Sequence, residues 1–259
     1  MQKITIKKIY KKKGKQPIVC LTAYTKNIAK IADKYCDIIL VGDSLGMVLY
    51  GMKTTRNVKI ETMILHAKAV KEISKKSLVV FDMPYKTYTN KFSAYKNAKK
   101  VIKLTKCDAI KLEGGKKISK IVSFLVKKGI PVLGHVGLLP QTSRNFKARG
   151  KTSIERKKIL DDAISISNSG AFAIIIECVV EKLAKQITKK ILIPTIGIGA
   201  SRYCDGQILV TEDLAGLSGF SPKFVKRYAN LNKSIEKSIK KYVKDVKMKR
   251  FPFVKNVYR

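Results

Sequence analysis

The chain has 259 residues, 45% of them hydrophobic, and 55 Lys and Arg against 18 Asp and Glu give it a formal net charge of +37. This length and hydrophobic content suit a single domain with one large core, and no run of about 18 apolar residues is present that could span a bilayer. The basic N-terminus, residues 1–15, lacks the apolar block and cleavage site of a signal peptide, which favours a cytoplasmic location.

Five cysteines are scattered along the chain: Cys20, Cys36, Cys107, Cys178 and Cys204. Their number is odd and no two have Cys-x-x-Cys spacing, which argues against a disulfide framework and against a structural zinc site. We expect reduced, mostly buried thiols.

The high positive charge has two competing explanations. Clustered Lys and Arg release counterions from phosphates, so a basic surface could hold nucleic acid or an anionic membrane. Here, however, the basic residues are spread along nearly every predicted helix, and Lys greatly outnumbers Arg. A drift towards AT-rich codons would enrich Lys and Ile together, and both are plentiful. We therefore expect no membrane partner and no specific nucleic-acid partner.

Short apolar segments that alternate with helical patterns dominate the chain. The segments expected to form strands are 17–23, 37–41, 78–82, 109–113, 129–135, 171–176, 193–197 and 207–210. The segments expected to form helices before residue 200 are 27–35, 60–74, 92–105, 118–127, 154–168 and 180–188. Repeated strand-then-helix units of this length predict a parallel sheet, and eight such units close into a (β/α)₈ TIM barrel. The predicted fold is therefore α/β, with residues 1–259 as one barrel domain.

A long amphipathic region, about 222–250, follows the last predicted strand. Its apolar residues recur every three to four positions and lysines fill the rest. We interpret it as extra C-terminal helices that pack on the barrel or on a partner subunit, rather than as a nucleic-acid-binding arm.

Ionisable residues stand at the ends of successive predicted strands, where barrels of this kind place their active sites. These residues are Asp43, Asp82, Lys111, Glu113, His135 and Glu177. Strand alternation puts Lys111 and Glu113 on the same face. Taken alone, Asp43 could be a helix cap or a turn residue. Six ionisable groups at strand ends are a poor way to build a core, so we expect a shared site.

The residue types at these positions suggest a chemistry. Three carboxylates, from Asp43, Asp82 and Glu113, suit Mg²⁺ with positions left for water or substrate. Such a cation can chelate a 2-oxo acid and stabilise an enolate.

The remaining polar groups can be assigned roles in the same reaction. Glu177 is the candidate base for the proton next to the carbonyl group. Lys111 and His135 are candidates to orient or neutralise the substrate oxygens, and Ser44 to hydrogen-bond the substrate carboxylate.

A glycine-rich segment, Gly197-Ile198-Gly199-Ala200-Ser201-Arg202, follows the seventh predicted strand. It lacks the third glycine of a dinucleotide-binding fingerprint and comes too late in the chain for one. Phosphate binding or close approach of a ligand to the backbone remain open for it.

Seven motifs together resemble the ketopantoate hydroxymethyltransferase (3-methyl-2-oxobutanoate hydroxymethyltransferase) family, in order and over about residues 5–252. The motifs are Val41-Gly42-Asp43-Ser44-Leu45-Gly46-Met47, Asp82-Met83-Pro84-Tyr85, Lys111-Leu112-Glu113-Gly114-Gly115, Gly134-His135-Val136-Gly137-Leu138, Glu177-Cys178-Val179, Ile196-Gly197-Ile198-Gly199-Ala200 and Asp205-Gly206-Gln207-Ile208-Leu209-Val210. The resemblance implies a barrel of the phosphoenolpyruvate/pyruvate type. It also implies Mg²⁺-assisted enolate formation and transfer of a hydroxymethyl group from methylenetetrahydrofolate to 3-methyl-2-oxobutanoate, giving 2-dehydropantoate in pantothenate biosynthesis.

The resemblance also implies roles for individual residues. It places Asp43, Asp82 and Glu113 in the metal site, in part through water. It makes Ser44, Asp82 and Lys111 contacts of the oxo acid, with Glu177 as the proton acceptor and His135 in an orienting role. Members of the family form large homo-oligomers, often decamers, so we expect a homo-oligomer here as well.

The chain departs from the family pattern at three places. The loop after the fifth strand reads Asn145-Phe146-Lys147-Ala148-Arg149-Gly150, which is shorter than usual and lacks a glycine pair. Ser201 replaces a frequent glycine and Cys204 a frequent threonine. Two alternatives are kept beside the family reaction: another Mg²⁺-dependent 2-oxo-acid lyase or mutase on the same barrel, and a basic nucleic-acid-binding protein.

Overall fold

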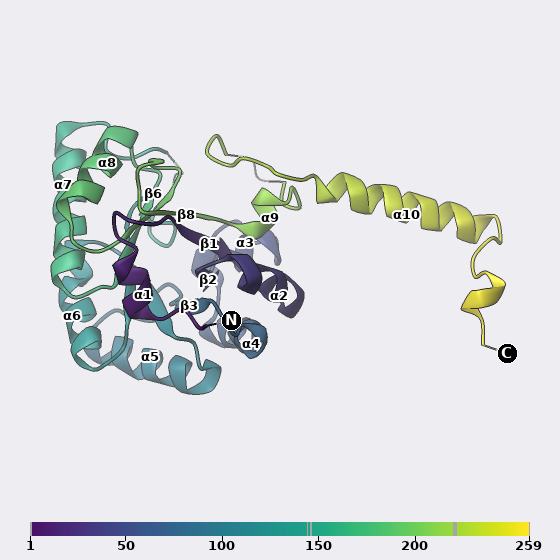
Figure 1. Cartoon of the computed structure of the whole chain (residues 1–259), viewed down its shortest axis with the longest axis horizontal. Coiled ribbons are helices and arrows are strands. Elements are labelled where there is room, and N and C mark those ends of the chain that lie inside the picture. Colours follow the sequence, from purple (N-terminus) through teal and green to yellow (C-terminus); the bar gives the residue numbers. More distant parts are fainter. Residues whose placement is uncertain (1, 144, 146, 220–221, 259) are drawn as a thin grey trace. The chain divides into compact units, whose positions relative to one another are not determined.

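The computed structural model describes residues 2–143, 145, 147–219 and 222–258. Its eight strands are β1 (Ile18–Thr22), β2 (Ile38–Val41), β3 (Leu78–Asp82), β4 (Ala109–Glu113), β5 (Val132–Gly137), β6 (Ala173–Glu177), β7 (Thr195–Ile198) and β8 (Gly206–Leu209). Each strand pairs in parallel with the next, and β8 pairs with β1, so the sheet closes on itself. The predicted (β/α)₈ barrel is confirmed (Figure 1).

Six long helices connect the first seven strands. They are α2 (Lys26–Tyr35), α4 (Ile60–Ile73), α5 (Lys91–Thr105), α6 (Ser119–Lys127), α7 (Ser153–Asn168) and α8 (Glu181–Lys190). Thr25, Asn90 and Thr152 begin three of them by accepting hydrogen bonds from backbone N–H groups of the first turn. Figure 1 shows α5, α6 and α7 along the outside of the barrel.

β6 begins at Ala173 instead of residue 171, and two strands that follow a proline also begin later than the sequence pattern predicts. β5 begins at Val132 instead of residue 129, and β7 begins at Thr195 instead of residue 193. In each case the residue just before the strand is a proline, Pro131 or Pro194, which has no N–H group to donate to a neighbouring strand. The two apolar runs were therefore longer than the strands within them.

Alternate residues of each strand face two separate apolar layers. In β4, Ile110 and Leu112 belong to the layer between strands and helices, whereas Ala109 belongs to the cluster inside the barrel. The interior cluster contains at least one residue from every strand: Ile18, Cys20, Ile38, Leu40, Leu78, Val80, Ala109, Leu133, Ala173, Ile175, Ile196 and Ile208. Apolar side chains thus fill the half of the barrel interior nearer the strand N-termini.

The N-terminal segment contributes to this interior cluster. Ile4 and Ile9 join it, and Ile9 lies on a short helix, α1 (Ile6–Lys11), that the sequence analysis did not anticipate. Thr5 caps α1 through its side chain, which accepts a hydrogen bond from the backbone N–H of Lys8. The lysine-rich start of the chain is therefore an ordered part of the barrel.

Smaller elements complete the first compact unit, residues 1–210. They are α3 (Leu45–Val48), η1 (Thr55–Asn57) and η2 (Lys116–Ile118). The whole barrel lies in this unit. No helix among the described residues is long and apolar enough to cross a membrane.

Residues 211–259 form a second compact unit with α9 (Thr211–Leu214), α10 (Leu231–Lys247) and η3 (Val254–Asn256). The helix expected from about residue 222 begins only at Leu231, where Asn230 caps it by accepting from the N–H of Lys233. The backbone before it is not helical because the N–H of Tyr228 donates to the carbonyl of Leu214. The organisation of residues 1–259 as one domain stays a prediction.

Candidate active site

The register of the sheet brings most of the predicted site residues together. Asp82 on β3 lies beside Lys111 on β4, and Glu113 lies beside His135 on β5. Glu177, at the end of β6, is two residues beyond Ile175, the neighbour of His135. Strand alternation points apolar side chains into the barrel interior near the strand N-termini. The same alternation points these polar side chains into the interior near the strand C-termini.

Asp82 and Lys111 form a buried ion pair. The Lys111 Nζ donates to both carboxylate oxygens of Asp82 at 2.8 Å. Burial by itself lowers the pKa of Lys111, but the charges of Asp82, Asp43 and Glu113 outweigh burial and raise it above its ordinary value. Lys111 is therefore a permanent positive charge at this site and not a proton acceptor.

Asp43 follows β2 and is a buried carboxylate with an unusual pKa. Its backbone N–H donates to Asp82 Oδ2 at 3.3 Å, which places the two residues side by side. Burial, followed by repulsion from the charge of Asp82, raises the pKa of Asp43 to about 7. The site thus holds more negative charge than Lys111 alone offsets.

His135 lies between two carboxylates. Its Nδ1 is 3.5 Å from Glu113 Oε2, and its Nε2 is 3.2 Å from Glu177 Oε2. Burial and the charge of Lys111 lower the pKa of His135, so the imidazole is neutral, while burial raises the pKa of Glu113 well above its usual value. Neither ring nitrogen makes a well-aligned hydrogen bond, and such orphaned buried polar atoms are typical of sites that receive a ligand.

Ser44, the predicted contact of the substrate carboxylate, is half-buried beside Asp43. Its hydroxyl group lies 2.7 Å from the hydroxyl group of Tyr24, which follows β1. Gly42 leaves room for this arrangement, because a Cβ atom there would lie 2.8 Å from Ser44 Oγ.

Two neutral residues of the site were missed by the sequence analysis. Gln141, in the loop after β5, is buried and donates to Asp43 Oδ2 at 2.9 Å, and its backbone N–H donates to Glu113 Oε1 at 2.7 Å. Tyr88, in the loop after β3, donates to Gln141 Oε1 at 2.5 Å. Neither residue is ionisable at neutral pH or stands at a strand end, so the pattern that revealed the others could not reveal them.

The donor set fits a divalent cation at Asp43 and Asp82. Two adjacent buried carboxylates repel each other, and Mg²⁺ commonly binds through one or two carboxylates while keeping several waters. Among the described residues, no three His, Cys, Asp or Glu side chains are arranged to hold a metal together. Glu113, the third predicted ligand, instead accepts from the Gln141 N–H and faces His135.

Among the described residues, the hydrogen bonds of the segments that depart from the family pattern do not reach the side chains of these acids, but the backbone N–H of Arg149 donates at 2.7 Å to the carbonyl of Cys178, the residue after Glu177. In the loop 145–150, Arg149 donates to the carbonyl and side-chain oxygens of Asn145, whereas Phe146 lies outside the described residues. Ser201 accepts from the N–H of Tyr203, and the Thr188 hydroxyl donates to the thiol of Cys204. None of these contacts involves a predicted site residue.

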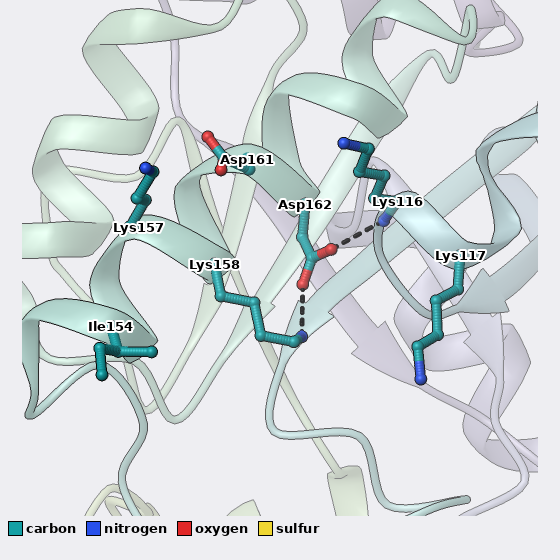
Figure 2. A pocket seen from close by; sticks show the side chains of 7 residues that line it. All are labelled: Lys116, Lys117, Ile154, Lys157, Lys158, Asp161 and Asp162. Carbon is teal, nitrogen blue, oxygen red and sulfur yellow. Dashed lines mark hydrogen bonds and ion pairs between the residues drawn. The ribbon is translucent and has the colours of Figure 1, made fainter.

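A separate open pocket of about 510 Å³ lies where η2 faces α7 (Figure 2). It is lined by Lys116, Lys117, Ile154, Lys157, Lys158, Asp161 and Asp162. Asp162 accepts from the Lys116 backbone N–H at 2.7 Å and from Lys158 Nζ at 2.8 Å. Gly115 is required for this anchoring, because a Cβ atom there would lie 2.0 Å from Asp162. Gly115, the second glycine after Glu113, therefore has a structural role.

Two solved structures show the same architecture. Phosphonopyruvate hydrolase, solved with oxalate and Mg²⁺, has a TM-score of 0.64 and 11% identity over 98% of this chain and 93% of its own. A 2,3-dimethylmalate lyase of the PEP mutase/isocitrate lyase superfamily has a TM-score of 0.62 and 12% identity over 98% and 88%. At such identities the likeness shows the fold alone, and it agrees with the (β/α)₈ barrel.

Sequence comparisons are more specific. The 3-methyl-2-oxobutanoate hydroxymethyltransferase of Pelagibacter ubique (strain HTCC1062) is 54% identical over 248 residues, which is 96% of each chain. That of Bartonella tribocorum (strain CIP 105476 / IBS 506) is 49% identical over 263 residues, covering 100% of this chain and 97% of the relative. A family model described as ketopantoate hydroxymethyltransferase matches residues 3–253. The chain belongs to the ketopantoate hydroxymethyltransferase family.

Proposed function

We propose that this chain transfers a hydroxymethyl group from methylenetetrahydrofolate to 3-methyl-2-oxobutanoate, giving 2-dehydropantoate for pantothenate synthesis. The observation that carries the proposal is the convergence of buried Asp43, Asp82, Lys111 and Glu113 at one end of the barrel interior. Family membership names the substrates, and these side chains supply groups suited to a 2-oxo acid.

The oxo acid would bind at the edge formed by Asp43, Asp82 and Lys111. Asp43 and Asp82 would hold Mg²⁺ directly, with Glu113 acting through water. When bound, Mg²⁺ supplies a Lewis acid that polarises the keto group. The Lys111 ammonium group, kept protonated by three carboxylates, adds a fixed positive charge where negative charge develops on the substrate oxygen.

Glu177 would remove the proton from C3 of the oxo acid. Its side chain is more exposed than those of Asp82 and Glu113, at 16% against 2% and 3%, so it is the acid best placed to reach a bound substrate. His135 Nε2, 3.2 Å from Glu177 Oε2, would orient the carboxylate. The electron pair of the C3–H bond forms the carbon–carbon double bond of the enolate, and the proton passes to Glu177.

Water would release the methylene carbon of methylenetetrahydrofolate as formaldehyde: both C–N bonds break, the oxygen of water forms the C=O bond, and its two protons pass to the two nitrogens of tetrahydrofolate. The enolate carbon would then form a bond to the formaldehyde carbon, the C=O electron pair moves onto oxygen, and that oxygen takes a proton back from Glu177 to become the new hydroxyl group. In this step the chain would hold the enolate in place and offset its negative charge through the Lys111 ammonium group, which Asp82 positions.

Exchange of the C3 proton tests the first half of this reaction without folate. In deuterated buffer with Mg²⁺, the wild-type chain should exchange the C3 proton of 3-methyl-2-oxobutanoate, as followed by proton NMR. Glu177→Gln should bind the oxo acid but exchange its proton roughly 10²–10⁴-fold more slowly. Exchange at the wild-type rate in that variant would assign the base elsewhere.

We also propose that the protein is a homo-oligomer, with a decamer as the expected state. Support comes from α10, whose apolar residues are exposed along its length: Leu231, Ile235, Ile239, Tyr242, Val243 and Val246. An amphipathic helix with no buried residue is suited to burial against another copy. Light scattering after size exclusion should give a mass several times that of one chain, and Ile239→Glu should lower it.

A cytoplasmic location is the matching proposal for the cell. All five cysteines are free and buried in the structure, which is compatible with a reducing compartment. Fractionation of the native organism, with the chain detected by antibody, tests it.

A further inference from the structure

Gln141 is buried, at 1% exposure, and forms hydrogen bonds to four residues around the site. Its side-chain Nε2 donates to Asp43 Oδ2 at 2.9 Å and to the carbonyl of Met83 at 3.0 Å. Its Oε1 accepts from Tyr88, and its backbone N–H donates to Glu113 Oε1. One neutral side chain therefore links the loops after β2, β3 and β5.

The contacts fix which way round the Gln141 amide lies. The Met83 carbonyl can only accept, so the amide atom next to it must be the NH₂ group. The same NH₂ group then donates its other hydrogen to Asp43, and Oε1 is left to accept from the Tyr88 hydroxyl group. Both amide hydrogens and the amide oxygen are used, so Gln141 has a single orientation.

This orientation constrains Asp43. The Gln141 hydrogen bond engages Asp43 Oδ2 and not Oδ1, the oxygen that would meet a cation. We infer that Gln141 is a positioning residue that sets the affinity of the site for Mg²⁺ by holding Asp43, and through its backbone Glu113, in a ligand-ready geometry. The inference rests on the proposed metal site. Groups that orient metal ligands in this way typically change metal affinity 10- to 100-fold.

The loop that carries Gln141 is also hydrogen-bonded to a residue from the segment after β2. Arg56, on η1, donates from Nε to the carbonyl of Gln141 at 2.9 Å and from its guanidinium nitrogen to the carbonyl of Thr142 at 2.8 Å. The Arg56 guanidinium group also lies 5.9 Å from the ring centre of Tyr85. Loops after β2 and β5 are thereby joined, which holds Gln141 in place without any ion pair.

Mg²⁺ titration calorimetry of the full chain tests the inference directly. Gln141→Met keeps the length of the side chain and removes its hydrogen bonds, and the Kd for Mg²⁺ should rise 10- to 100-fold. Gln207→Met is the matched control, because the side chain of exposed Gln207 on β8 donates to the carbonyl of Ser201 and, among the described residues, to no group of the site. Its loss should leave the Kd unchanged. Circular dichroism of each metal-free variant checks that the barrel is retained.

Two further variants separate positioning from a merely structural role. In an Asp43→Asn background, Gln141→Met should cause no further loss of Mg²⁺ affinity, because its effect passes through Asp43. Tyr88→Phe removes the bond that orients the amide, together with a longer bond of 3.3 Å to the backbone carbonyl of Glu113. The Kd should rise by about 10-fold, at the lower end of the range, even if Gln141→Met does not fold.

The outcomes are distinguishable. If the wild-type chain binds no Mg²⁺, the proposed metal site is wrong. If the wild-type chain binds Mg²⁺ and both Gln141→Met and Tyr88→Phe bind it equally well, the metal site stands and the role of Gln141 is wrong. An equal loss of affinity with and without the Asp43 carboxylate also contradicts the inference.

Discussion

Buried carboxylates occur at both ends of the barrel, and the two sets differ in how they are paired. At the end where strands begin, Asp37, Asp108 and Asp205 each stand just before a strand, bond to a lysine from the first 13 residues and accept a backbone N–H from a neighbouring strand. At the end where strands finish, Asp43 and Glu113 have no lysine partner of their own among the described residues.

The pKa directions follow from this difference. Burial alone would raise the pKa of Asp205, but the Lys13 ammonium group and the N–H groups of Thr195 and Gly14 lower it below the ordinary value. For Asp43 burial dominates and the pKa rises to about 7. We interpret the first set as stabilising the barrel and the second as performing chemistry, and each prediction below tests that division.

The largest effect is expected at the functional end. Asp82→Asn and Asp43→Asn should each lower product formation about 10²–10³-fold, because each removes a charge that holds the cation or Lys111. The free energy of unfolding of metal-free Asp43→Asn, from urea titration, should change little, since a repelling carboxylate has been removed. Metal-free Asp82→Asn should be less stable than wild type, because buried Lys111 loses its partner. An Asp43→Asn variant that unfolds readily would place Asp43 with the structural set.

A smaller effect, on stability and not on activity, is expected at the other end. Asp205→Asn should lower the free energy of unfolding by about 3 kcal/mol, because it leaves the partly buried Lys13 without its partner. Mg²⁺ affinity and the turnover rate of the folded fraction should match wild type. Loss of turnover with stability retained would contradict the division.

Below about pH 4, this structural set should contribute to the pH dependence of stability. The pKa values of Asp108 and Asp205 lie below their ordinary value of 3.8, so below about pH 4 the unfolded chain binds more protons than the folded chain. Their contribution is complete above that pH and is lost as the pH falls through the folded pKa. As the pH is lowered below about 4, the Tm of Asp205→Asn should fall less steeply than the Tm of the wild-type chain.

The smallest effect is expected from the substitution of single lysines in the N-terminal segment. Lys3 is 47% exposed in its pair with Asp108, and Lys13 is 22% exposed in its pair with Asp205. Lys3→Gln should cost under about 1 kcal/mol, because water screens the exposed charge and Asp108 retains Lys71. Lys13→Gln should cost more in the same urea titration, and equal costs would show that burial does not control these pairs.

The sequence was informative wherever an ionisable residue ended an apolar strand. Asp82 and Glu177 stand out because each is a charge directly after an apolar run, which has no structural purpose in a barrel core. Glu113 stands out because it ends its strand on the same face as Lys111. Periodicity also located all eight strands, although Pro131 and Pro194 moved two strand starts.

The features of the site and of the barrel that the sequence did not reveal depend on contacts between residues far apart in the chain. Gln141 joins Asp43 across 98 residues, and Lys13 pairs with Asp205 across 192, so no local pattern connects them. The lysine-rich start illustrates the same limit. Its charge looked like compositional drift, yet Lys3, Lys12 and Lys13 each meet an aspartate beside a strand. Roles of this kind can be recognised only in the folded structure.

The measurement that tests the central claim most directly is product formation followed by mass spectrometry. Purified chain, Mg²⁺, 3-methyl-2-oxobutanoate and methylenetetrahydrofolate should give a product heavier than the oxo acid by one hydroxymethyl group. A chelator should abolish it, and Asp205→Asn should still form it. Folded, Mg²⁺-loaded protein that yields no such product would contradict the proposed reaction.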